Sequence, residues 1–137
     1  VFILGDLSFR NIDETMNILN NLNGDKILIK GNHDDMYLKK KRFDTSLFKE
    51  ILDYKEFNYN GYNVCMMHYP INYFRNQDKE KNPAVMLHGH IHSNPVIVPK
   101  YSYNVCMDLN NYVPIKLQTA IDKALSNNKE NNINGKF

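Results

Sequence analysis

The fold is decided by Val1-Phe2-Ile3-Leu4-Gly5-Asp6 together with Lys26-Ile27-Leu28-Ile29-Lys30-Gly31. Both stretches are short apolar runs that end at a glycine, which is typical of strands buried within a sheet. Between them, Asn11 or Asp13 can cap a helix that ends at Gly24. A strand, a helix and a second strand within about thirty residues predict a parallel βαβ unit.

The rest of the chain predicts a mixed sheet. Residues 54–59 and 62–67 flank Asn60-Gly61, a strong signal for a two-residue hairpin. Shorter strands are predicted at residues 84–87 and 96–98, an antiparallel strand at 101–107, a short helix at 44–52 with Asp44 or Thr45 as its cap, and a last helix from Ile115 or Thr119 through Leu125. We expect one α/β domain over residues 1–125 and a frayed, Asn-rich tail over residues 126–137.

Composition excludes several classes of protein. Seventeen Lys and Arg against fifteen Asp and Glu give a net charge of +2, too slight to imply nucleic acid or a membrane surface as partner. No apolar run is long enough for a membrane-spanning helix, and no signal peptide is visible. Cys65 and Cys106 lie in apolar runs without metal-ligand or redox spacing, which favours two buried thiols in a reducing, cytoplasmic compartment over a disulfide.

The chain opens directly into an apolar strand and has no initiating methionine. A domain seldom begins inside its own core, because chain ends need solvated backbone. We therefore expect an additional segment upstream of Val1.

All five histidines follow predicted strands. They are His33 in Gly31-Asn32-His33-Asp34, His68 after residues 62–67, and His88, His90 and His92 in the run that follows residues 84–87; Asp6 occupies the same kind of place after the first strand. Loops beyond the carboxyl ends of strands converge on one crevice in open α/β sheets. Imidazole, carboxylate and amide ligands without a thiolate suit a divalent metal of intermediate softness.

Each piece also has a structural interpretation. Asp6 can be a turn or cap residue, Gly31-Asn32-His33-Asp34 a tight turn, and His68 a satisfied core histidine. His90 and His92 are harder to explain in this way, because alternate residues of an extended segment point in the same direction. His88 is either structural or an outer partner of a ligand, and Asp108 is another candidate for that outer role.

Together, Gly5-Asp6, Gly31-Asn32-His33-Asp34, His68 and Gly89-His90-Ile91-His92 resemble four of the five signature blocks of the calcineurin-like metallophosphoesterases. The run Tyr103-Asn104-Val105-Cys106-Met107-Asp108 is most similar to the small bacterial and phage-type members. The resemblance spans about residues 1 to 118. It implies a four-layer sandwich of mixed β-sheet flanked by helices.

The resemblance also implies an activity: hydrolysis of phosphate mono- or diesters, with hydroxide bridging two divalent ions as the nucleophile. Manganese is the favoured metal, and Fe, Zn, Ni and Mg are the alternatives. Asp6 would bridge both ions, Asn32, His68 and His90 would complete one site, and His92 would bind the other ion. His33 would stabilise the transition state or protonate the leaving oxygen, with Asp34 orienting it. The substrate would be a phosphorylated small molecule or a nucleotide.

One signature block, an Asp-x-His that would precede the Gly-Asp block and supply two ligands to the ion on His92, has no counterpart here. Either an upstream segment supplies it or this chain has lost one metal, in which case the protein would be an inactive interaction module. The cations over residues 39–42 either attract a phosphorylated substrate or form a solvated loop. Tyr69, Tyr73 and Phe74 either wall the substrate site or close the core, and a nucleic-acid-binding function lacks a basic patch of sufficient size.

Overall fold

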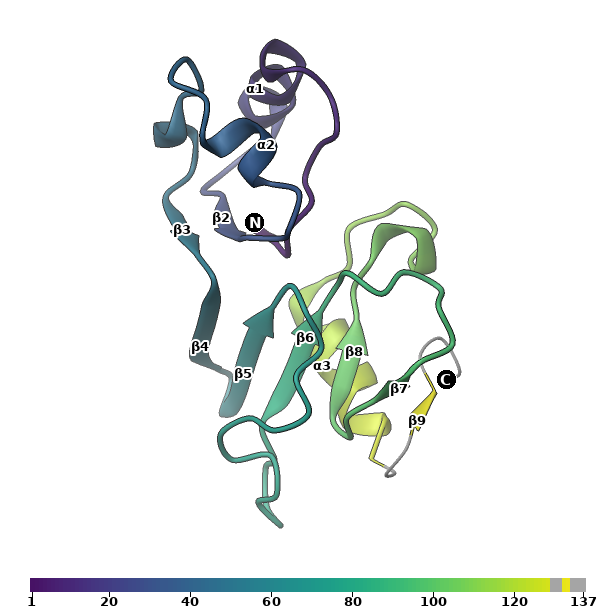
Figure 1. Cartoon of the computed structure of the whole chain (residues 1–137). Coiled ribbons are helices and arrows are strands. Elements are labelled where there is room, and N and C mark those ends of the chain that lie inside the picture. Colours follow the sequence, from purple (N-terminus) through teal and green to yellow (C-terminus); the bar gives the residue numbers. More distant parts are fainter. Residues whose placement is uncertain (129–131, 134–137) are drawn as a thin grey trace.

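The computed structural model describes residues 1–128 and, for the backbone, residues 132–133 (Figure 1). The N-terminal part is the predicted βαβ unit: β1 (Phe2–Ile3), α1 (Ile12–Asn21) and β2 (Ile27–Ile29), with β1 and β2 parallel. β3 (Glu50–Leu52) adds to β2 in parallel and completes a three-stranded sheet. The side chain of Asn11, one of the two predicted caps, accepts a hydrogen bond from the N–H of Glu14 at the start of α1.

A second, four-stranded sheet is mixed and has the order β4-β5-β6-β8. β4 (Tyr54–Tyr59) and β5 (Tyr62–Met67) form the predicted antiparallel hairpin, and Asn60 and Gly61 both have the positive φ that a two-residue turn requires. β6 (Val85–His88) and β8 (Ser102–Asn104) then add in parallel. β7 (Ile97–Val98) pairs with β9 (Asn132–Ile133) in a separate ribbon.

Apolar packing joins the two larger sheets. One core cluster combines Ile29 of β2 with Val64, Val85 and Leu87 of the second sheet and Ile121 of α3 (Leu117–Ser126). A second cluster, which includes Leu19 and Leu28, lies between the first sheet, α1 and the short helix α2 (Asp35–Leu38). The molecule is therefore α/β with mixed sheets flanked by helices, as predicted at that level.

The predicted helix over residues 44–52 is wrong beyond its first turn. Thr45–Leu47 form a single 3-10 turn, η1, capped by the Asp44 side chain as predicted, and Glu50–Leu52 are a strand. The Lys49 N–H donates to the carbonyl of Lys26, which starts the pairing with β2. This long-range pairing overrides the helix-like spacing of the apolar residues.

The predicted antiparallel strand over residues 101–107 is also wrong. Only Ser102–Asn104 are extended, they run parallel to β6, and Met107–Leu109 form a second 3-10 turn, η2. All three strand residues are buried, as in a parallel strand covered on both faces. The alternation of side chains carries no information about strand direction.

In the C-terminal region, α3 ends one residue later than predicted. The next residue, Asn127, is buried beside β8, where its side chain donates a hydrogen bond to the Ser102 carbonyl. These residues and β9 depart from the predicted frayed tail. The remaining residues of the predicted tail, 129–131 and 134–137, lie outside the described part of the chain. Across the described residues, no helix combines the length and the apolar character needed to cross a membrane.

Candidate metal centre

The centre of the molecule is the place where the carboxyl ends of β1, β2, β5 and β6 meet (Figure 1). The imidazole of His68, which follows β5, connects the two sheets there. Its Nδ1 donates to the carbonyl of Leu4, the residue after β1, at 2.7 Å. This bond places the hydrogen of a neutral ring on Nδ1 and leaves a lone pair on Nε2.

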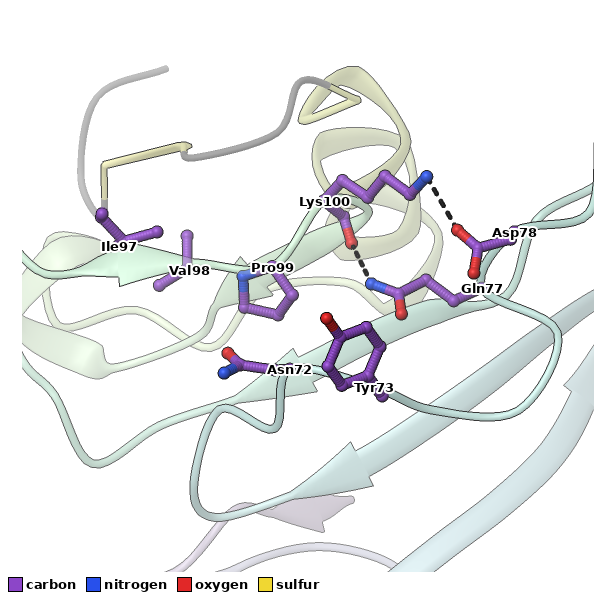
Figure 2. Close-up of a pocket in the computed structure, with 8 residues that line it drawn as sticks. All are labelled: Asn72, Tyr73, Gln77, Asp78, Ile97, Val98, Pro99 and Lys100. Carbon is purple, nitrogen blue, oxygen red and sulfur yellow. Dashed lines mark hydrogen bonds and ion pairs between the residues drawn. The ribbon is translucent and has the colours of Figure 1, made fainter.

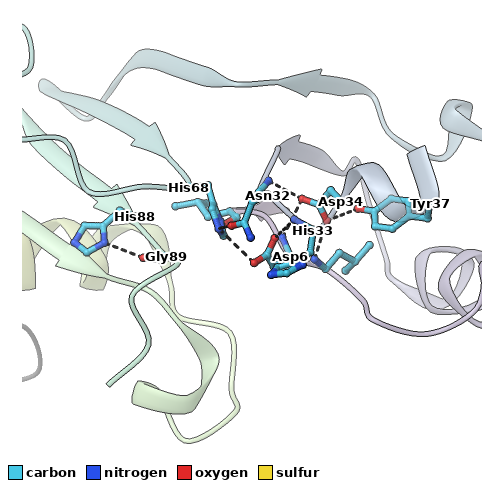
Figure 3. A network of polar contacts seen from close by, with 11 residues as sticks. Asp6, Asn32, His33, Asp34, Tyr37, His68, His88 and Gly89 are labelled. Carbon is cyan, nitrogen blue, oxygen red and sulfur yellow. Dashed lines mark hydrogen bonds and ion pairs between the residues drawn. The ribbon is translucent and has the colours of Figure 1, made fainter. Parts of the chain in front are cut away.

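Two oxygens face that lone pair. The Nε2 atom of His68 lies 3.2 Å from Oδ1 of Asn32 and 3.4 Å from Oδ2 of Asp6 (Figure 3). His68 is only 1% exposed, whereas Asp6 is half-buried and Asn32 is exposed, so the three groups meet where the core opens to solvent. An imidazole nitrogen, an amide oxygen and a carboxylate that converge in this way are suited to bind a cation.

His90, in the loop after β6, completes this group. One ligand atom each from Asp6, His68 and His90 lies within 4.8 Å of the others. Desolvation, followed by the nearby His68 ring, lowers the pKa of His90, which favours the neutral form of its ring. The ring of Tyr69 packs edge-on against both histidines, with centroids 5.0 Å from His68 and 4.6 Å from His90.

The backbone at these ligands is unusual. Asp6 and His90 have φ angles of 54° and 66°, in the left-handed region that non-glycine residues seldom adopt. Such conformations cost about 1–3 kcal/mol each and cluster at functional sites. Gly5 and Gly31 are required by close approach, since a Cβ on Gly31 would lie 2.8 Å from Cε1 of His68 and one on Gly5 would lie 2.6 Å from Cα of Gly31.

Asp34 has a different partner from the one expected. Its fully buried carboxylate accepts hydrogen bonds from the N–H groups of Asp6, Leu7 and Gly31, at 2.9, 3.0 and 2.7 Å, and from the hydroxyl of Tyr37 at 2.7 Å (Figure 3). Four bonds saturate its two oxygens, so Asp34 fastens the loop after β1 to the loop after β2. The prediction that it orients the His33 ring is corrected accordingly.

His33 itself is exposed at the edge of this group. Its backbone N–H donates to Oδ1 of Asp6 at 2.9 Å, and its ring lies against Phe9, with centroids 4.9 Å apart. The ring therefore lies beside the loop cluster and outside the group of Asp6, His68 and His90. Phe9, which is 64% exposed, was not singled out from the sequence, because a lone aromatic residue in a loop carries no signal.

His92 belongs to another group. Its ring, the Cys106 sulfur and the Asp108 carboxylate each offer a ligand atom within 4.8 Å of the others, and Nδ1 of His92 lies 3.4 Å from Oδ2 of Asp108. Both cysteines are free, but only Cys65 is fully buried; Cys106 is half-buried, which corrects the prediction of two buried thiols. Asp108, a candidate for an outer role beside a histidine ligand, therefore lies next to His92.

His88 lies outside both groups. It is fully buried, its Nδ1 contacts the Gly89 carbonyl at 3.2 Å, and its Nε2 has no hydrogen-bond partner among the described residues (Figure 3). Desolvation is the main cause that lowers the pKa of His88 to about 4. Of the two interpretations left open for His88, the geometry favours the structural one.

The remaining candidates lie away from the histidines. Lys39 and Arg42 form surface ion pairs with Asp35 and Asp13, which favours a solvated loop over a substrate funnel. Phe74 packs in the core. Tyr73 lines a cavity of about 470 Å³ beside Gln77 and Lys100, and no candidate ligand contributes to its wall (Figure 2).

No family model matches the chain. A curated relative from Methanocaldococcus jannaschii, the uncharacterized protein MJ1445, is 32% identical over 130 residues. The alignment covers 88% of this chain and 63% of the relative, so the chain spans less than two thirds of that protein's length. A crystal structure of the Aquifex aeolicus protein of unknown function AQ665 shares the fold, with a TM-score of 0.60 and 28% identity over 89% of this chain and 74% of that one.

Proposed function

We propose that this chain carries the metal centre of a phosphoesterase that resembles the calcineurin-like superfamily. In this proposal its two main sheets are those of the metallophosphoesterase sandwich. It hydrolyses a phosphate mono- or diester of a small molecule or nucleotide with the help of divalent metal ions. The observation that carries the proposal is the Nε2 atom of the buried His68 ring, which faces oxygens of Asn32 and Asp6 at 3.2 and 3.4 Å. In the neutral tautomer with its hydrogen on Nδ1, the Nε2 atom is an acceptor like the two oxygens, so a cation between the three atoms would satisfy them together.

The residues present fit such an ion. Asp6, Asn32, His68 and His90 would hold it, with one carboxylate, one amide oxygen and two imidazoles, a set suited to manganese or iron. His92 would hold the second ion. When bound, such ions lower the pKa of water and neutralise charge on a phosphoryl group.

The protein side chains have separate tasks in this proposal. The Leu4 carbonyl keeps the His68 proton on Nδ1, and the His33 N–H holds the Asp6 carboxylate in place. Asn32 contributes a neutral ligand, which limits repulsion of an anionic substrate. The exposed His33 ring, which lies against Phe9, donates a proton to the leaving oxygen.

The test separates metal binding from turnover. Manganese affinity is measured by calorimetric titration of the 137-residue chain, and hydrolysis of chromogenic phosphate monoesters and diesters is measured on the complete gene product. His90→Ala should weaken manganese binding at least about tenfold, because it removes a direct ligand. His33→Ala should keep manganese binding and lower kcat by about 10²–10⁴-fold.

Arg10→Ala is a suitable control, since this exposed side chain forms an ion pair with Glu14 on the surface and should change neither readout. Wild-type affinity for manganese in His90→Ala would refute the metal site. Tight manganese binding without hydrolysis by the complete protein would instead favour an inactive, metal-binding interaction module.

A further inference from the structure

The group formed by His92, Cys106 and Asp108 has a ligand chemistry of its own. One nitrogen, one sulfur and one carboxylate oxygen lie within 4.8 Å of each other, and two of them are 3.4 Å apart. Ligand atoms in a tetrahedral zinc site are about 3.5 Å apart, given bonds of about 2.0–2.3 Å. A small contraction of this group therefore produces three ligands around one ion, with a fourth position left for water.

Buried polar contacts hold these ligands in place. Asn104, 1% exposed at the end of β8, donates from its side-chain nitrogen to the His92 carbonyl and accepts from the Cys106 N–H, both at 3.0 Å. The Cys106 carbonyl in turn accepts from the side chain of Asn110 at 2.8 Å. Side-chain hydrogen bonds thus fix the loop after β6 against the turn that follows β8.

The surroundings of the Cys106 sulfur act on its thiolate in two directions. Burial, the largest cause, raises the pKa of the thiol, whereas the backbone N–H groups of His92 and His90 act to lower it. His92 has a φ of 45°, a strained conformation that lets its N–H face the sulfur while its ring reaches Asp108. Thiolate ligands select zinc and other soft divalent ions over manganese and magnesium.

We infer that His92, Cys106 and Asp108 form a thiolate-containing site for a soft divalent ion, of which zinc is the representative. The site differs in composition from the group of Asp6, Asn32, His68 and His90, which has no sulfur. The two groups accordingly sort metals, with the softer ion on Cys106. Binding deprotonates the thiol and releases its proton to solvent. The inference concerns metal binding alone and does not depend on phosphoesterase activity.

Cobalt(II) provides the direct test, because a cobalt–thiolate bond produces a charge-transfer absorption in the near ultraviolet. The full chain is titrated with cobalt(II) as wild type, as Cys65→Ala and as Cys106→Ser. Cys65 is a matched control, since it is the other cysteine of the chain and lies buried in β5. We expect the absorption in wild type and in Cys65→Ala, and its loss in Cys106→Ser.

A second measurement uses only the wild-type chain and so does not depend on a variant that folds. Zinc should slow alkylation of Cys106 by iodoacetamide at least about tenfold, read by mass spectrometry, and should be displaced by a chelator. Cobalt that binds without the absorption, an absorption that persists in Cys106→Ser, or unchanged alkylation of Cys106 with zinc would each overturn the inference. If the chain shows the absorption but the complete gene product hydrolyses no phosphate ester, this site stands and only the proposed activity is refuted.

Discussion

The carboxylate of Asp34 should be the most sensitive single group in the fold. Asp34→Asn keeps the size of the side chain but replaces one oxygen by an NH₂ group. Each oxygen of the wild-type carboxylate accepts two hydrogen bonds, so the NH₂ group removes two of the four acceptances and faces at least one backbone N–H that it cannot bind. Hydrogen bonds to a charged group contribute about 1.5–3 kcal/mol each, so the free energy of unfolding should fall by about 3–5 kcal/mol.

Urea unfolding followed by far-ultraviolet circular dichroism measures this loss. With a slope of about 1–3 kcal/mol per molar urea, the midpoint should fall by roughly 2 M. Asp35→Asn is the matched control: the neighbouring carboxylate is exposed and pairs with Lys39, so its midpoint should stay close to wild type. Similar midpoints for the two variants would refute the idea that Asp34 fastens the two loops together.

Other outcomes follow from the site and its surroundings. The folded state protonates His88 only near pH 4, whereas the unfolded chain does so near pH 6.5. This contribution to stability, about 3 kcal/mol, is therefore complete above pH 6.5 and is lost as the pH falls toward 4. Urea unfolding of the wild type in the presence of a chelator should show this fall in the free energy of unfolding between pH 6.5 and pH 4. A fall of equal size in His88→Gln would contradict the assignment to His88. Gly31→Ala should weaken manganese binding at least about tenfold in calorimetric titration, because the added Cβ would press on His68. Gly24→Ala is the control: a Cβ there would meet no atom within 4 Å, so the manganese affinity should stay unchanged.

Local signals in the sequence were sufficient for the first sheet and the hairpin. Apolar runs that end at glycine predict β1 and β2, and Asn60-Gly61 predicts the turn that joins β4 to β5. The convergence of Asp6 and His68 also follows from local signals, since both follow strands whose carboxyl ends meet. These features depend on the residues themselves and on short-range geometry.

Features that depend on distant partners were not predictable. Glu50–Leu52 form a strand because β2 offers backbone partners more than twenty residues away. Asp34 lies beside His33 in sequence, yet its carboxylate binds N–H groups of Asp6 and Leu7, which are 28 and 27 residues away. The association of Cys106 with His92 likewise depends on β8 lying parallel to β6, a direction that the alternating pattern does not encode.

The hydrogen bond from Nδ1 of His68 to the Leu4 carbonyl joins the three-stranded sheet to the four-stranded sheet. The same imidazole ring would bind the proposed ion. A cation bound to this ring would stabilise the folded state, in which the two sheets are in contact, and not the unfolded chain. The melting temperature should then rise with the free metal concentration, by the equivalent of about 2.7 kcal/mol at a hundred times the dissociation constant. If an ion binds here as proposed, removal of that metal should therefore lower the stability of the contact between the two sheets.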